Sequence, residues 1–361
     1  MGLVKISKGG SGGGGGGGVT QIIAGSGICI SPIGGTGVVT ICSNVVGGVE
    51  VLGSGTCSTY RCGVNNSASG NCSASLGGSC NVASGNYSSI SGGYCNTASC
   101  YANAIGGGYK NCVTDYYSSI SGGYKNSSSG YANAIGGGQS NTTSGYQSTI
   151  SGGYKNTASA NRSSVVGGIN NTASGVYSAI VGGKSNTAAG QYANIGGGRC
   201  NYAGQHASVS GGYYNTALNN FSFVGGGTLN CVCGGSTDSS IVGGCLNKNC
   251  QGFSIIGGGW NNCLSGSTGL SGILSGGENC ITGGIGFIGS GCSNGILGGN
   301  HGVILNGVSN SLSAKYSVIL NGKSNYVSGE NSFVGAGAAA GCIDVCPAFC
   351  CAPNALISLS S

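Results

Sequence analysis

One asparagine recurs at a fixed interval along most of this chain, and it constrains the fold more than any other feature. It stands at ten positions that are 15 residues apart: Asn66, Asn81, Asn96, Asn111, Asn126, Asn141, Asn156, Asn171, Asn186 and Asn201. It continues at intervals of 14 to 17 residues at Asn215, Asn230, Asn247, Asn262, Asn279, Asn294, Asn310 and Asn325. Such repeats bury their core by stacking on one another, so we expect a repeat protein of 18 units.

Two apolar columns accompany the asparagine. A branched residue stands six positions before it, at Ile90, Ile105, Ile120, Ile135, Ile150, Val165, Ile180 and Ile195. An alanine usually stands two positions after it, at Ala68, Ala83, Ala98, Ala158, Ala173, Ala188 and Ala203. Both columns have polar or small neighbours, and this period-two alternation is typical of half-buried strands. The sequence therefore predicts an all-β fold, a parallel β-solenoid or β-roll of about 18 coils spaced by about 4.8 Å.

Composition supports an ordered chain with glycine-rich turns. The chain has 81 Gly but only 3 Pro in 361 residues, and Gly does not recur every third residue, so collagen is excluded. Charged residues make up only 5% and hydrophobic residues 39%, which excludes charge-driven disorder. Glycine supplies turn conformations that other residues resist. We expect the asparagines to form a stack of side-chain amides in which each bonds the next.

The sequence divides into four segments. Residues 1–18 form a Gly-rich tether, and residues 19–62 form an N-terminal β module with the strands VTQIIA, ICISPI and GVVTIC. Residues 63–335 carry the repeats of the solenoid, and residues 336–361 form a Cys-rich cap or trimerisation segment.

Charge and hydropathy argue against several partners. The net charge of +6 comes from 12 basic and 6 acidic residues spread thinly, so no basic patch predicts nucleic-acid binding. No apolar run is long enough to span a membrane, and the first residues lack the pattern of a signal peptide. The 21 Cys nevertheless indicate an oxidising environment, which a particle released by cell lysis would reach.

Catalytic and metal-binding chemistry is not expected. Six acids are present, Glu50, Asp115, Asp238, Glu278, Glu330 and Asp344, and none lies one or two coils from another at the same repeat position. His206 and His301, the two histidines, are about six coils apart. A polysaccharide-cleaving solenoid would need clustered carboxylates, and a calcium-binding one would need an Asp in every turn. We therefore expect no catalytic residue, no metal site and no cofactor.

Several cysteines occupy the same position in adjacent coils. These candidate disulfide pairs are Cys80 with Cys95, Cys233 with Cys250, and Cys263 with Cys280. Stacked coils give Cα separations that a disulfide accepts, although reduced and buried thiols are the alternative reading. In the cap, Cys342, Cys346, Cys350 and Cys351 are candidate cross-links within or between chains. A metal site there is the alternative, but no His accompanies the thiols.

Two outward columns are candidates for binding. The first is a stripe of Tyr94, Tyr109, Tyr124, Tyr154 and Tyr213 with Lys110, Lys125 and Lys155 beside it. It would bind a glycan or a protein, or else cover the coil edge or pack between chains. The second is Thr157, Thr172 and Thr187, but its neighbouring column is Ser and the Thr run is broken, so ice binding is only a minor alternative.

The repeats resemble the head repeats of trimeric autotransporter adhesins. The segment SGVYSAIVGGKSNTAAG, from Ser174 to Gly190, carries the resemblance most clearly, and it extends over residues 63–335. The resemblance implies a left-handed parallel β-roll with three chains packed side by side. The segment from Val19 to Ser43 resembles the start of phage tail fibres and of fibres from large viruses.

These observations predict a structural and adhesive function. We expect a homotrimeric virion fibre or spike, of a phage or a large virus, that is held at its base through the N-terminal region and meets a host-surface glycan or protein. Each coil buries little apolar area of its own, which favours packing by further copies. The localisation would be the virion surface or the extracellular space. The alternatives are a self-assembling extracellular filament, a bacterial surface adhesin and, more weakly, an ice-binding protein or a polysaccharide-degrading enzyme.

Overall fold

The structure of the chain is a computed structural model. It describes side chains for residues 53–60, 65–233, 237–266, 269–298 and 301–337, and strand backbone also at 5–8, 19–23, 28–31, 40–43, 50–52 and 61. These residues contain strands, turns and bends but no helix. The chain divides into two compact units, Met1–Gly152 and Gly153–Ser361, and each is described by itself.

The first unit begins with three antiparallel strand pairs. β1 (Lys5–Lys8) pairs with β2 (Val19–Ile23), β3 (Ile28–Ser31) pairs with β4 (Thr40–Ser43), and β5 (Glu50–Leu52) pairs with β6 (Thr59–Arg61). Strands β2, β3 and β4 each overlap one of the three strands that the sequence predicts for the N-terminal module. β1 lies in the segment for which the sequence predicts a tether.

Two parallel ladders follow in the first unit. The Ile ladder, named for its inward isoleucines, continues from β6 through β8 (Ala74–Ser75), β10 (Ser89–Ile90), β12 (Ala104–Ile105), β14 (Ser119–Ile120), β16 (Ala134–Ile135) and β18 (Thr149–Ile150). The Ala ladder contains β7 (Ser67–Ala68), β9 (Val82–Ala83), β11 (Thr97–Ala98), β13 (Cys112–Val113), β15 (Ser127–Ser128) and β17 (Thr142–Thr143).

The second unit repeats both ladders with the same side-chain directions. Its Ile ladder contains β20 (Ser164–Val165), β22 (Ala179–Ile180), β24 (Asn194–Ile195), β26 (Ser208–Val209), β28 (Phe223–Val224), β30 (Ser240–Ile241), β32 (Ile255–Ile256), β34 (Gly272–Ile273), β36 (Gly286–Ile288), β38 (Gly302–Ile304), β40 (Val318–Ile319) and β42 (Phe333–Val334). Its Ala ladder contains β19 (Thr157–Ala158), β21 (Thr172–Ala173), β23 (Thr187–Ala188), β25 (Tyr202–Ala203), β27 (Thr216–Ala217), β29 (Cys231–Val232), β31 (Lys248–Asn249), β33 (Cys263–Leu264), β35 (Cys280–Ile281), β37 (Gly295–Ile296), β39 (Ser311–Leu312) and β41 (Tyr326–Val327).

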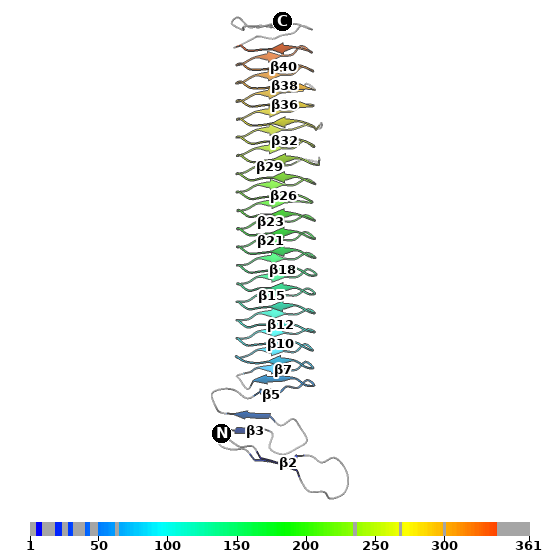
Figure 1. Cartoon of the computed structure of the whole chain (residues 1–361), viewed down its shortest axis with the longest axis vertical. Helices are drawn as coiled ribbons and strands as arrows, with labels where there is room; N and C mark the ends of the chain where they lie inside the picture. The colour runs from blue at the N-terminus through cyan, green and yellow to red at the C-terminus, as the bar shows by residue number, and fades with distance from the viewer. Residues whose placement is uncertain are drawn as a thin grey trace, which may run out of the picture. The chain divides into compact units, whose positions relative to one another are not determined.

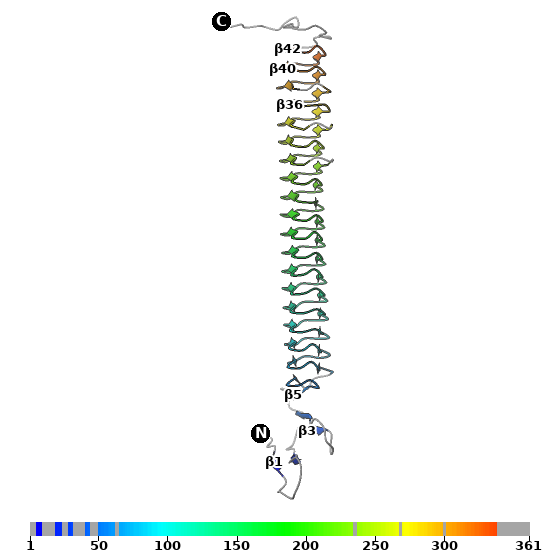
Figure 2. The same cartoon turned by 90° about the vertical axis from the view of Figure 1, so that its right-hand side faces the viewer.

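The predicted all-β parallel solenoid of about 18 turns is confirmed. In each unit the strands of one turn stack on the equivalent strands of the next, as Figure 1 shows. Figure 2 shows the two ladders on two sides of the coil. The pairing joins equivalent residues, so that Ile105 is the Cα partner of Ile120 and Ala173 is the partner of Ala188.

The core lies between the two ladders. The inward isoleucines and valines of the Ile ladder are buried, as the sequence predicts, and so are the alanines of the Ala ladder. A third inward column is mostly serine, with Ser88 and Ser118 as examples. In the later turns of the second unit, larger residues such as Leu264, Ile281 and Ile296 replace the alanine. In two of these turns glycine takes the place of the inward serine, and a Cβ on it would lie close to the larger residue, 3.0 Å from Ile281 at Gly286 and 2.7 Å from Leu312 at Gly302.

The asparagine column is a ladder of side chains bonded to backbone. The backbone N–H of Asn126 donates to Oδ1 of Asn111 at 3.0 Å, and its own Nδ2 donates to the carbonyls of Gly122 and Gly138, each at 3.0 Å. This differs from the predicted stack in which each amide bonds the next amide. Direct amide pairs occur at a minority of turns, as between Asn96 and Asn81 at 3.0 Å. Each asparagine thus joins its own turn to both neighbours.

Each regular turn also contains two left-handed residues that are not glycine. Lys125 has φ 54° and Tyr117 has φ 56°. A left-handed non-glycine residue costs about 1–2 kcal/mol. Hydrogen bonds between turns oppose this cost, because Lys125 N donates to Tyr109 O at 2.8 Å and Tyr117 N donates to Tyr101 O at 3.0 Å. Glycines of the Gly-Gly pairs adopt positive φ as the sequence predicts, with 95° at Gly123, whereas these non-glycine positions were not predicted.

Candidate functional site

The first unit carries the larger part of the predicted aromatic stripe. We define the Tyr–Lys stripe as Tyr94, Tyr109, Tyr124, Lys110 and Lys125. The three tyrosines lie in the turn after the Gly-Gly pair, where they form parallel bridges to one another. Lys110 and Lys125 each follow a bridged tyrosine directly and have left-handed backbone conformations. The side chains of both lysines are exposed. The stripe therefore repeats once per turn.

The rings of the stripe stack on one another. The centroids of Tyr94 and Tyr109 are 5.4 Å apart with an angle of 10° between planes, and those of Tyr109 and Tyr124 are 5.0 Å apart with an angle of 5°. Each lysine lies over the ring before it, with Nζ of Lys110 at 5.2 Å from the centroid of Tyr109 and Nζ of Lys125 at 5.1 Å from that of Tyr124. These are cation–π distances.

Stacking determines what the stripe can bind. The inner ring faces are covered by neighbouring rings, while Tyr94 is 46% exposed and both lysines are exposed. A hydrogen bond that the Lys110 ammonium group donates to the Tyr109 hydroxyl oxygen is the main cause that raises the pKa of Lys110, so this group stays protonated. The stripe consequently offers hydroxyl groups and positive charge at intervals of one turn. Polar or anionic groups on an extended surface would match it.

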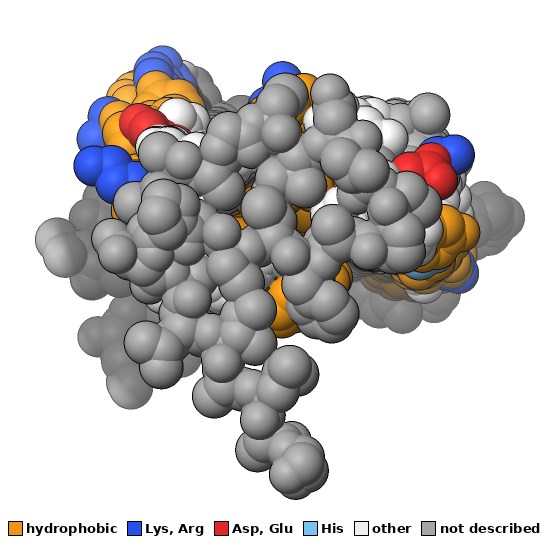
Figure 3. Space-filling model, turned by 90° about the horizontal axis from the view of Figure 1, so that it is seen from above, with side chains coloured by type: hydrophobic (Ala, Val, Ile, Leu, Met, Phe, Trp, Pro, Cys, Tyr) orange, Lys and Arg blue, Asp and Glu red, His pale blue; other side chains and the backbone are white. Residues whose placement is uncertain are grey.

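The remaining stripe residues lie in the second unit. Lys155 Nζ lies 5.1 Å from the ring centroid of Tyr154, which repeats the cation–π pair of the first unit. Tyr154 bridges to Ile169, which is 42% exposed and carries no ring. The aromatic row resumes at Tyr213, where Arg199 lies 5.6 Å from the ring. In Figure 3 hydrophobic side chains gather with Lys and Arg side chains at one edge of the coil.

The structure contains a second aromatic row that was not predicted from the sequence. In the first unit it contains Tyr87, Tyr101, Tyr117, Tyr131 and Tyr146, whose successive ring centroids are 5.1 to 5.5 Å apart. In the second unit Tyr177, Tyr192, His206 and Phe221 continue in the same manner at 5.0 to 5.1 Å. The 15-residue spacing of Tyr101, Tyr116, Tyr131 and Tyr146 was the available signal. The stripe is thus one of two ring columns.

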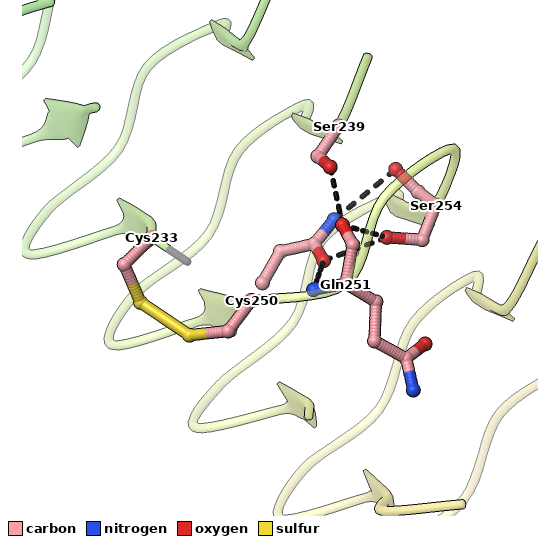
Figure 4. The surroundings of a disulfide bond; sticks show 6 residues. Cys233, Ser239, Cys250, Gln251 and Ser254 are labelled. Carbon is pink, nitrogen blue, oxygen red and sulfur yellow. Dashed lines mark hydrogen bonds between the residues drawn. A yellow bond between two sulfur atoms is a disulfide. The ribbon is translucent and has the colours of Figure 1, made fainter. Parts of the chain in front are cut away.

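One candidate cysteine pair is joined in the structure. A disulfide connects Cys233 and Cys250, with 4.6 Å between their Cα atoms, as Figure 4 shows. Beside it the Gln251 carbonyl accepts hydrogen bonds from Ser239 and from Ser254, the latter at 2.8 Å. The bridge joins two consecutive turns where an inward asparagine, Asn249, takes the place of the alanine.

The other two pairs carry free thiols that lie close together. Cys263 and Cys280 are Cα partners in the Ala ladder. A hydrogen bond from Cys280 is the main cause that lowers the pKa of Cys263 to about 6, and the same contact raises the pKa of Cys280. Hydrogen bonding from Ser79 lowers the pKa of Cys80, and Cys95 also contacts it. Disulfide formation in these two pairs stays a prediction.

The other sequence candidates are distributed as follows. Cys342, Cys346, Cys350 and Cys351 lie outside the described residues. Thr157, Thr172 and Thr187 are Cα partners, and Tyr202 ends their row. Within the described ranges, no three His, Cys, Asp or Glu side chains are grouped so that they would hold a metal ion. The described part of the chain also has no helix that is long and apolar enough to cross a membrane.

The comparisons with known proteins add no family. No known family model matches the chain, and no curated protein matches it. We therefore argue function from the columns and pairs described above.

Proposed function

We propose that this chain is a structural fibre protein, and that it forms a homotrimeric virion fibre which mediates attachment to a surface. One observation carries the proposal: the outward side chains form rows in which equivalent residues of consecutive turns touch. Tyr94, Tyr109 and Tyr124 show this most clearly, at 5.0 to 5.4 Å between centroids. A row of repeated groups binds a repetitive or extended surface through many weak contacts, which together give high avidity.

The hydrogen bonding of the turns suits a mechanical role. Every strand pair within the two ladders joins neighbouring turns, and each buried asparagine adds bonds on both sides. Buried asparagines leave no amide donor unpaired when they bond two carbonyls, so the ladder resists local opening. A fibre that projects from a particle needs this resistance along its whole length.

The homotrimer follows from the thin core. Most turns of the first unit bury one isoleucine, one small residue and one serine or asparagine, which is little apolar area for 15 ordered residues. Further copies would bury exposed apolar side chains and leave the Tyr–Lys stripe accessible. The N-terminal region would hold the fibre to its base, and the Tyr–Lys stripe would meet the host surface.

Electron microscopy and sedimentation of the purified protein test the proposal together. We expect isolated rods of uniform length and a trimer at micromolar concentration. Polymers joined end to end would favour a self-assembling filament instead. A well-folded monomer at that concentration would contradict the trimeric fibre.

A further inference from the structure

The outer face of the Ile ladder changes character within the second unit. In β20 to β26 its outward strand residues are small or polar: Ser164, Ala179, Asn194 and Ser208. Two of these turns carry an exposed valine two positions later, Val166 and Val181. From β28 onward, every turn has a large apolar residue on this face. We define the apolar strip as Phe223, Val242, Ile255, Leu274 and Phe287. It continues with outward Val or Phe residues in β38, β40 and β42.

The strip has a regular alternation of size. Phe223, Ile255 and Phe287 are outward strand residues, and each is followed two positions later by glycine. In the strands between them the order is reversed, because Ser240 and Gly272 are the strand residues and Val242 and Leu274 follow two positions later. Large residues therefore shift from one side of the face to the other at each turn.

This alternation produces a filled and continuous surface. A Cβ atom placed on Gly272 would lie 3.5 Å from the ring of Phe287 and 3.6 Å from Cγ2 of Ile255. The large side chains of the turns on either side thus lie against the glycine between them. Val242 is still 51% exposed and Leu274 is 53% exposed, so the filled surface faces outward. Flat apolar sheet faces of this kind pack against a second sheet at about 10 Å.

The opposite face of the same turns has a different chemistry. The outward residues of the Ala ladder there include Thr216, Lys248 and Ser311, as well as cysteines. Exposed large apolar or aromatic side chains occur on this face only at some turns, at Leu218, Leu297 and Tyr326. The apolar strip contains no charged residue and its strands contribute none to that face. Large apolar residues are therefore continuous from turn to turn on the face of the Ile ladder and interrupted on the face of the Ala ladder, so the first face is the better suited to burial.

We infer that the apolar strip is the surface through which copies of this chain pack against one another. The strip repeats at the strand spacing of about 4.8 Å, and a second copy presents the same spacing and the same filled surface. A partner without stacked strands would not match this spacing. A stable interface buries about 800 Å² on each partner, and an aromatic side chain such as Phe buries about 150–250 Å². Half-exposed side chains on the eight turns from β28 to β42 supply an area of that order.

This inference deepens the proposed fibre, because it says where the copies meet. The test compares Ile255→Lys with Leu274→Lys in one variant against Thr216→Lys with Ser311→Lys in another. All four positions are outward, and the control adds the same charge to the Ala ladder. We expect at least tenfold weaker association of the strip variant in sedimentation, an unchanged control, and native far-ultraviolet circular dichroism for both.

A cross-linking measurement keeps the test independent of stability. A photoreactive benzoylphenylalanine at position 274 should give covalent multimers in the full chain, and the same residue at position 216 should not. If the wild type associates while the strip variant associates equally well, the strip is not the interface and the fibre proposal stands. If the wild type is monomeric, both fail.

Discussion

At the scale of the residue, the two glycines of one pair have unequal roles. Gly123 has φ +95°, and a Cβ there would lie 2.2 Å from the Gly138 carbonyl oxygen and 2.6 Å from Nδ2 of Asn126. A Cβ added to Gly122 would have no atom within 4 Å. The pair looks uniform in the sequence, yet only the second glycine is required by its conformation and by the close approach of the next turn.

Substitution of this pair should give opposite results. Gly123→Ala should destabilise the protein by several kcal/mol, because backbone must move and the φ is unfavourable for alanine. Gly122→Ala is the matched control and should change stability by less than about 0.5 kcal/mol. Chemical denaturation measures both. Equal losses would show that the first glycine is also constrained.

A second residue-scale prediction concerns buried hydroxyls. Ser128 takes the place of the inward alanine in β15, is fully buried, and its Oγ has no hydrogen-bond partner. An unsatisfied buried hydroxyl costs about 1–3 kcal/mol. We expect Ser128→Ala to raise the free energy of unfolding by about 1 kcal/mol, while Ser127→Ala on the outer side of the same strand leaves it unchanged. A loss of stability in Ser128→Ala would mean that the hydroxyl does have a partner.

At the scale of the element, the asparagine ladder and the strand ladders support the same stacking. The Nδ2 atom of Asn126 donates hydrogen bonds to two glycine carbonyls, and its Oδ1 accepts a hydrogen bond from the backbone N–H of Asn141 at 2.9 Å. Because the bonds involve three consecutive turns, the loss of one side chain affects the turns on both sides.

Asn126→Ala should therefore be costly. It removes three hydrogen bonds and leaves buried backbone groups unpaired, so we expect a loss of about 3 kcal/mol in the free energy of unfolding. Amide hydrogen exchange should locate the damage at the N–H of Asn141. Ser127→Ala, on the neighbouring residue, serves as the control. A loss confined to a few tenths of a kcal/mol would contradict the structural role of the ladder.

The thiols of the Ala ladder give a prediction about pH. Because the pKa of Cys263 is lowered to about 6, its reactive thiolate should already dominate at neutral pH. Burial raises the pKa of Cys231 in the same ladder, so that thiol should react only in alkaline solution. Alkylation of the reduced protein, followed by peptide mass spectrometry between pH 5 and 10, measures both. Identical pH profiles for the two thiols would exclude the contact with Cys280.

At the scale of the whole molecule, the question is which columns stay in contact with solvent once copies assemble. The Tyr–Lys stripe and the apolar strip both face outward in the single chain, and each is suited to a different contact. The hydroxyl and ammonium groups of the Tyr–Lys stripe are suited to a contact that stays hydrated. The strip, which lacks charge, is suited to permanent burial.

Two substitutions in the first unit test whether the Tyr–Lys stripe faces solvent or is buried between copies. Ile120→Ala opens a cavity in the core and should cost about 2–5 kcal/mol. Tyr124→Ala should be nearly silent if the stripe faces solvent, because the ring is exposed in the single chain. Thermal unfolding compares the two variants. Similar losses for both would show that the tyrosines are buried between copies.

The sequence by itself determined the architecture, because a 15-residue period with two inward columns has few solutions other than a stacked coil. It also identified the stripe residues and the cysteine pairs, since equivalent positions in adjacent coils must be neighbours. Only the tertiary structure showed that Lys125 and Tyr117 are left-handed, that the asparagine amides bond backbone, and that large and small residues alternate around Gly272. These features depend on the path of the backbone through each turn and on contacts between turns. A periodic pattern records which residues are equivalent, but it does not record the dihedral angles or the hydrogen-bond partners that the stacked turns impose.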